Sequence, residues 1–298
     1  MADSSKGRRS GPGRPPRQPG GRRPAAWIGL AVVLLLLTGV VVAAVWRTGA
    51  GRPGSASSGP SAASGQSGGP PVPAAVLQKL TAIPSAAFDA AGTGGLPAPQ
   101  AVPAGTQVPA APGAGTKPTL LYVGAEFCPY CATERWALVV ALARFGTWQG
   151  LELSRSSSQD VYPDTPTFTF LHASYSSPYL AVRTVELTGR EPGADGRYPP
   201  LQSPTAAEQA LMNRLDPGGS IPFLAVGRSY WVGSPVAPEL FQGKSWEAIA
   251  REIAQGKSAA AQQVLAAANQ ISAAVCQATG GRPAEVCASP AVRGVKLR

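Results

Sequence analysis

Four cysteines carry the chemistry that this sequence suggests. Cys128 and Cys131 enclose a Pro-Tyr dipeptide, and Cys276 and Cys287 lie close to the C-terminus of the 298-residue chain. A Cys-x-x-Cys motif that lies between a strand and a helix is typical of proteins that exchange disulfides. A zinc half-site and an inert structural disulfide are the alternatives for the same motif.

The elements around the motif determine which cysteine reacts first. The short apolar run 119–123 predicts a buried strand, and apolar residues three and four apart predict a helix over 130–145. Cys128 would then be the N-cap residue, Pro129 the first helical residue, and Cys131 would lie one turn into the helix. Unpaired amides and the positive dipole end of the helix stabilise a thiolate at Cys128. A lowered pKa makes this sulfur more often a thiolate and a better leaving group, and leaves Cys131 to resolve the mixed disulfide.

An uncharged segment near the N-terminus predicts a membrane anchor. Residues 25–46 contain no charge, and a helix of this length measures about 33 Å, enough to cross a hydrocarbon core of roughly 30 Å. Seven basic residues precede the segment, so we expect 1–24 to be cytoplasmic and 47–298 to lie outside the cell membrane. The alternative is a cleaved signal peptide with a weak cleavage site at 42–44, which also exports the domain.

The distribution of charge argues against nucleic acid as a partner. The net charge is +10, but residues 117–298 contain 16 basic and 14 acidic residues, so the excess belongs mainly to the N-terminal tail. Residues 47–71 are rich in Gly, Ser and Pro and predict a flexible linker. Residues 72–118 predict a short helix that docks on the main domain, followed by a loop, and 119–298 predict the globular domain.

The even number of cysteines in an exported chain favours two disulfides. Ten residues separate Cys276 from Cys287, and they include the Gly-Gly-Arg-Pro turn 280–283. A bridge here would pin the last helix to the C-terminal segment and stabilise the fold by about 2–3 kcal/mol. Two alternatives are a relay pair that passes electrons to Cys128 and Cys131, and a zinc ion bound by all four cysteines.

The rest of the domain alternates between strand and helix patterns, which predicts the α/β class. Residues 167–173 and 180–187 are β-rich and could form a hairpin, and 221–232 predict a hairpin that turns at 227–228. Other expected elements are a strand at 151–153 and helices at 206–215, from 245, and at 258–278.

A second motif supports a family resemblance. Ser220-Ile221-Pro222 precedes a predicted hairpin about 90 residues after the Cys-Pro-Tyr-Cys motif. Together the two motifs resemble those of the thioredoxin superfamily. The resemblance implies a cis Ile221–Pro222 bond in a loop that faces the cysteines, keeps metal away from them and binds the substrate backbone. An ordinary trans proline at a strand start is the alternative.

The resemblance also implies roles for residues next to the cysteines. Pro129, Tyr130 and Ile221 would line the substrate groove, and Pro222 would belong to the catalytic site. Glu126 would be similar to the buried acid of thioredoxins, which relays protons to the second cysteine, here Cys131. The alternative for Glu126 is a solvated charge at the end of a strand.

The spacing of the two motifs makes the resemblance to the superfamily more specific. It implies a thioredoxin-like fold with an insertion between about 156 and 216, together with C-terminal helices. Pro-Tyr is the dipeptide of glutaredoxins, but the anchor and the C-terminal cysteines are unlike them, and the chain is more similar to the DsbA-like group. The most detailed resemblance is to the family DUF929 over about 72–290. It rests on residues 124–131, Tyr175-Ser176-Ser177, Ile221-Pro222-Phe223 and the terminal cysteine pair.

From these motifs we expect a membrane-anchored, extracytoplasmic thiol–disulfide oxidoreductase that acts on protein thiols or disulfides without a cofactor or metal. Four residues do not decide its direction, because the potentials of such motifs span about −270 to −120 mV. A membrane redox partner would reset an oxidase or a reductase. The alternative is a non-enzymatic module that binds peptides or a partner and whose disulfides are structural.

Overall fold

The computed structural model describes residues 68–298. The predicted cytoplasmic tail, the predicted membrane helix at 25–46 and most of the predicted linker lie outside the described residues. Within 68–298, no helix is long and apolar enough to cross a membrane. Residues 70–72, at the end of the predicted linker and just beyond it, run along a strand of the domain: Leu153 N–H donates to the Pro70 carbonyl, and Val72 N–H to the Leu151 carbonyl.

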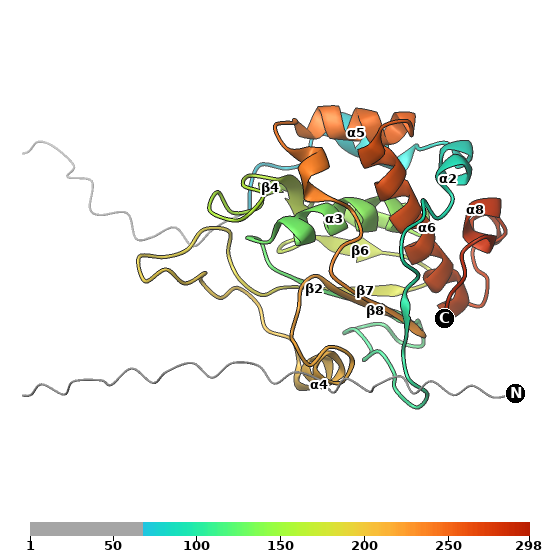
Figure 1. The fold of residues 1–298 in the computed structure, drawn as a ribbon. Coiled ribbons are helices and arrows are strands. Elements are labelled where there is room, and N and C mark those ends of the chain that lie inside the picture. Colours follow the sequence, from blue (N-terminus) through green and yellow to red (C-terminus); the bar gives the residue numbers. More distant parts are fainter. Residues whose placement is uncertain (1–67) are drawn as a thin grey trace, which may run out of the picture. The chain divides into compact units, whose positions relative to one another are not determined.

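A five-stranded mixed sheet forms the centre of the domain, in the order β1-β9-β8-β2-β7 (Figure 1). Strand β2 pairs in parallel with β7 and antiparallel with β8, while β9 pairs antiparallel with β8 and with the short β1. The bounds are β1 Gln100–Ala101, β2 Thr119–Gly124, β7 Ala181–Glu186, β8 Phe223–Val226 and β9 Ser229–Val232. The domain is therefore α/β, as predicted.

Helices cover both faces of this sheet (Figure 1). On one face α3 packs against α6, and α5 packs on α6 and α1. On the other face, Leu211 and Met212 of α4 close a smaller cluster over Leu121, Val123 and Phe223. The bounds are α1 Ala74–Thr81, α2 Ser85–Ala91, α3 Pro129–Leu142, α4 Ala206–Leu215, α5 Trp246–Gln255, α6 Ala259–Ala278, α7 Ala284–Cys287 and α8 Pro290–Arg293, with a 3-10 turn at Pro238–Phe241.

Two small antiparallel pairs lie outside the main sheet, and they correct one prediction. Strands β4 (Glu152–Arg155) and β5 (Pro166–Thr169) pair with each other, and β3 (Thr147–Gln149) pairs with β6 (Ser174–Ser176). The predicted hairpin between 167–173 and 180–187 is therefore not formed. The second of these runs, β7, pairs in parallel with β2 in the main sheet, and its Val185 belongs to the same buried cluster as Leu211 and Met212 of α4.

Strand β5 holds the β4–β5 pair against the start of α3. Thr167 Oγ1 donates to the Ala132 carbonyl at 2.7 Å, and Trp136 Nε1 donates to the Pro166 carbonyl at 2.8 Å. Trp136 is fully buried, with its ring 4.3 Å from that of Phe168. These contacts fix the first turns of α3, where both motif cysteines lie.

The other predicted elements are mostly confirmed. The short helix at the start of 72–118 is α1, and it docks on α5. The hairpin β8–β9 turns at Gly227-Arg228 as expected. Gly227 has a positive φ of 56°, the left-handed conformation that favours glycine. Residues 92–118 form the predicted loop except at β1, and α2, α7 and α8 were not predicted.

The predicted disulfide between Cys276 and Cys287 is present and joins the end of α6 to α7. Its position argues against a relay to the motif cysteines. Ala278, at the end of α6, lies against Gly227, at the end of β8 opposite to Phe223. Phe223 pairs with Val123 at the end of β2 that leads to Cys128. The two cysteine pairs are thus at opposite ends of the sheet, which is also inconsistent with a single zinc ion bound by all four.

Candidate functional site

Cys128 and Cys131 are free cysteines at the N-terminus of α3. As predicted, Cys128 is the N-cap residue, Pro129 occupies the first helical position, and the Cys128 Sγ accepts a hydrogen bond from the Cys131 N–H at 3.2 Å. Cys128 is 6 % exposed and Cys131 is fully buried. Only Cys128 can therefore meet a reagent from solvent.

The pKa values of the two thiols are shifted in opposite directions. The hydrogen bond from the Cys131 thiol lowers the pKa of Cys128 against the opposing effect of burial, and the Cys131 N–H and the charge of Arg135 lower it further. Burial raises the pKa of Cys131 well above the ordinary value, and the hydrogen bond to Cys128 and its charge raise it more. Cys128 is therefore suited to attack and Cys131 to act as a proton donor beneath it.

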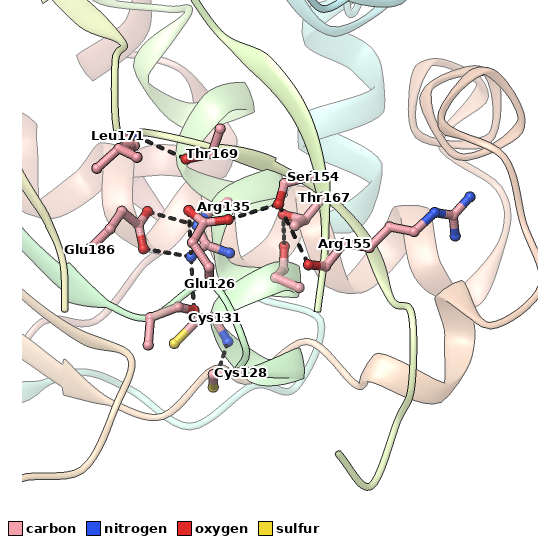
Figure 2. A network of polar contacts seen from close by, with 12 residues as sticks. Glu126, Cys128, Cys131, Arg135, Ser154, Arg155, Thr167, Thr169, Leu171 and Glu186 are labelled. Carbon is pink, nitrogen blue, oxygen red and sulfur yellow. Dashed lines mark hydrogen bonds and ion pairs between the residues drawn. The ribbon is translucent and has the colours of Figure 1, made fainter. Parts of the chain in front are cut away.

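A buried polar network lies next to the cysteines, and Arg135 is its centre (Figure 2). The guanidinium forms a fork with the Glu186 carboxylate at 2.9 and 2.6 Å, and Nη2 also donates to the Ala125 carbonyl at 2.9 Å. Arg135 and Glu186 are fully buried. Burial raises the pKa of Glu186 to about 7; Arg135 opposes this shift and Glu126 adds to it.

Glu126 joins the network, as expected for a buried acid rather than a solvated charge. It is 6 % exposed, its Oε1 lies 3.6 Å from Arg135 Nη2, and its Oε2 accepts a hydrogen bond from Ser154 Oγ at 2.7 Å. Ser154 lies on β4 and is partly exposed. Glu126 thus lies between a buried cation and a hydroxyl that reaches toward solvent.

Pro222 lies at the same end of the sheet as the cysteines. Val123 of β2 is opposite Phe223 of β8, so the register places Pro222 beside Gly124, from which the chain continues to Cys128. The Ile221–Pro222 bond is cis, as predicted. The Pro222 carbonyl accepts a hydrogen bond from Gly233 N–H at 2.8 Å.

The residues next to Cys128 in the sequence contact aromatic side chains from distant loops. Tyr130 and Val161 are the exposed large hydrophobic residues of 68–298, at 39 % and 73 %. The Tyr130 ring meets that of Tyr162 edge-on at 6.0 Å, and the Phe127 ring stacks on that of Tyr198 at 4.2 Å. Exposed apolar side chains that gather at one place are typical of surfaces that bind protein.

Sequence reasoning placed both cysteines, Glu126, Tyr130 and Pro222, but missed several neighbours. Arg135 and Glu186 were overlooked, although each is a charge within a mostly apolar predicted helix or strand. Such a charge must find a partner inside the protein, and opposite signs on two buried elements were the available signal. Tyr162 and Tyr198 come from irregular loops, where no sequence pattern predicts proximity.

Glu134 is a further buried carboxyl group, on the second turn of α3. It accepts a hydrogen bond from Ser234 Oγ at 2.8 Å, and burial raises its pKa to about 7, against the effect of this bond. The ordinary value for a glutamate is 4.5. The folded protein therefore holds a proton between about pH 4.5 and 7 that the unfolded chain has released.

This difference predicts a pH-dependent effect of Glu134→Gln. The contribution of the protonated carboxyl group to stability is fully present below pH 4.5 and is lost as the pH rises through 7. We expect Gln to be nearly neutral at pH 5 and to stabilise the protein by about 1–3 kcal/mol relative to wild type at pH 8. Denaturant unfolding of both proteins at each pH measures it, and a difference that does not change with pH contradicts the assignment.

Among residues 68–298 there is no group of three or more His, Cys, Asp or Glu side chains that could hold a metal ion. A thiol with a lowered pKa and a small exposed surface, next to a fully buried thiol, fits nucleophilic attack on a disulfide.

A family model matches part of the chain. The family model described as "Domain of unknown function (DUF929)" matches residues 110–193, which include β2, the Cys-Pro-Tyr-Cys motif, α3 and β7. This supports the resemblance noted in the sequence and carries no substrate or activity with it. Comparisons with curated proteins and with solved structures found no match.

Proposed function

We propose that this protein is a thiol–disulfide oxidoreductase with a thioredoxin-like fold, and that it exchanges disulfides with other proteins through Cys128 and Cys131. The observation that carries the proposal is the asymmetry of the two sulfurs: Cys128 Sγ caps α3 and accepts the Cys131 N–H, while Cys131 is fully buried. The sheet order and the position of Pro222 beside the cysteine end of β2 support the thioredoxin-like assignment. In this assignment, the insertion lies between about 156 and 216, as the spacing of the two motifs implies.

The reaction follows from this asymmetry. The Cys128 thiolate attacks one sulfur of a substrate disulfide, forms a mixed disulfide, and the other substrate sulfur leaves as a thiolate. Cys131 then loses its proton and attacks Cys128 Sγ, which forms the Cys128–Cys131 disulfide and releases the second substrate thiolate. The substrate gains two electrons and the dithiol loses them. The reverse sequence oxidises a substrate dithiol.

Glu126 is proposed as the group that takes the proton of Cys131. It is buried beside Arg135, and Ser154 connects its carboxylate to the partly exposed side of β4. A carboxylate in this place can pass a proton between a buried thiol and water. Tyr130 and the aromatic side chains around Cys128 would hold the substrate segment.

The cellular location of the domain is proposed from the sequence. The uncharged segment 25–46 would anchor the protein in the cell membrane with the domain outside, where protein thiols are oxidised and substrates are available. A dithiol or disulfide protein of the membrane would reset the Cys128–Cys131 pair after each turnover.

Equilibration of the purified full-length chain with glutathione buffers tests the proposal. We expect Cys128 and Cys131 to interconvert reversibly between dithiol and disulfide at a potential between about −270 and −120 mV. We expect Cys276–Cys287 to remain oxidised over this range, and mass spectrometry after thiol labelling separates the two pairs. The Cys128→Ser protein is the control. A Cys128–Cys131 pair that forms no disulfide in any buffer would contradict the proposal.

A further inference from the structure

Arg135 is a charged residue without exposed surface, one turn after Cys131 on α3. Its partners are the Glu186 carboxylate, the Ala125 carbonyl and, at 3.6 Å, the Glu126 carboxylate. Figure 2 shows this group directly next to the two cysteines. Arg135 and Glu186 take no part in the bond-making and bond-breaking steps of the proposed exchange.

The Ala125 carbonyl connects Arg135 to the position of Cys128. It accepts hydrogen bonds from Arg135 Nη2 at 2.9 Å and from the Cys128 N–H at 3.3 Å. Ala125 lies in the segment that joins β2 to α3, between Gly124 at the end of β2 and Cys128, the N-cap residue of α3. One guanidinium therefore braces the segment from which both sulfurs take their positions.

The charges around Arg135 do not resemble a pair that is optimised for stability. Two carboxylates, Glu186 and Glu126, face one guanidinium, and the ring of Tyr122 lies 6.0 Å from it. Within the described part of the chain, Arg135 Nη1, Glu126 Oε1 and the Tyr122 hydroxyl are buried without a hydrogen-bond partner. Buried ion pairs often contribute little net stability, and unpaired buried polar atoms cost free energy.

We propose that Arg135 is a positioning residue of the cysteine pair: held by Glu186, it fixes the Ala125 carbonyl beneath Cys128 and stabilises the Cys128 thiolate with its charge. The inference rests on the disulfide exchange proposed above and adds its electrostatic control. The charge of Arg135 lowers the pKa of both thiols, which agrees with its place beside them. The groups that face it from the surrounding elements are Tyr122 of β2, Glu126 and Glu186.

The proposed role of Arg135 has a consequence for the direction of disulfide exchange. A cation that stabilises the thiolate stabilises the reduced form, because the disulfide carries no charge. A dithiol whose reduced form is stabilised is a stronger oxidant. Arg135 therefore shifts the pair toward oxidation of protein dithiols, and its loss should shift the pair toward reduction of disulfides.

Ultraviolet titration of the Cys128 thiolate in the full-length chain tests the proposal. We expect Arg135→Met to reduce the thiolate population at a given pH about tenfold, a rise of one pH unit in the midpoint. Glu186→Gln removes a negative charge but keeps the shape, so we expect a lower or unchanged midpoint. Arg144→Met is the matched control, because Arg144 is a partly buried arginine just beyond the other end of α3 that hydrogen-bonds Ser272. It should leave the midpoint in place.

The opposite signs separate electrostatic control from a merely structural role. If Arg135 and Glu186 are merely structural, Arg135→Met and Glu186→Gln should both raise the midpoint or both leave it unchanged. Either result overturns the proposal. If Arg135→Met does not fold, Arg135→Met with Glu186→Met removes both buried charges together, a change that proteins tolerate better. This double variant is compared with Glu186→Met alone, and it should have the higher midpoint.

The test also distinguishes this proposal from the one on which it rests. The midpoint is measured without turnover, so a wild-type protein that exchanges no disulfide defeats the proposed function whatever its midpoint. A protein that exchanges disulfides normally while Arg135→Met leaves the midpoint unchanged defeats only the role of Arg135. In the glutathione buffers, Arg135→Met should also lower the ratio of dithiol to disulfide about tenfold, the same change in thiolate stabilisation.

Discussion

The Cys131→Ser protein should accumulate covalent adducts with its partners, all linked through Cys128. The serine leaves the attacking sulfur at the start of α3 and removes the buried thiol that resolves the mixed disulfide. Adducts should appear on non-reducing gels of cells that express Cys131→Ser and should disappear on reduction. Mass spectrometry of the cross-linked peptides identifies the cysteine that carries each partner.

The matched control for this trap is Cys128→Ser, which should form none of these adducts and should lose insulin reduction. A non-enzymatic binding module makes the opposite prediction, because its partners would bind without a covalent link and Cys128→Ser would retain them. Absence of Cys128-linked adducts from Cys131→Ser cells, with no insulin reduction or oxidation by wild type, would end the enzyme interpretation.

In the reduced protein, Cys128 should react with iodoacetamide far faster than Cys131. The pKa of Cys128 is lowered and that of Cys131 is raised well above the ordinary value, and Cys131 has no exposed surface. Because each pKa unit changes the thiolate population tenfold, we expect a rate ratio of at least about 100 at pH 7. Peptide mass spectrometry over a time course measures both rates in one sample.

The pH dependence of the same reaction provides the control. The midpoint of the pH–rate curve at Cys128 should lie below pH 9, the ordinary pKa of a thiol, while the rate at Cys131 should continue to rise above that pH. Cys131 should remain slow in Cys128→Ser, because its burial persists. Similar rates for the two cysteines in the folded wild type would contradict the assignment of Cys128 as the attacking sulfur.

The positions of the reactive cysteines could be predicted from the sequence more accurately than the elements that surround them. The cysteines could be placed because a buried strand, a Cys-Pro dipeptide and an amphipathic run define a helix start within a few residues. The hairpin β8–β9 could be placed because Gly227 supplies a turn between two apolar runs. In both cases the deciding contacts are local in sequence.

The features that sequence reasoning missed depend on contacts between distant residues. The runs at β5 and β7 are both rich in β-favouring residues, and nothing local indicates that one pairs with β4 and the other with β2. Arg135 and Glu186 are 51 residues apart and meet only because α3 crosses the sheet beside β7. Helix α2 is short and has no side-chain cap, and a segment of that kind gains its helical structure from packing rather than from its own sequence.

The point at which the chain enters the domain has a mechanical consequence. Pro70 and Val72 are hydrogen-bonded to the segment that begins β4, and β4 pairs with β5, which holds the Ala132 carbonyl of α3 through Thr167. Tension on the chain ahead of Pro70 would therefore load β4 and β5 first and reach α3 at its cysteine end, before it reached the five-stranded sheet. If the domain is tethered to a membrane at this end, a force on the tether would reach the reactive sulfur through these contacts.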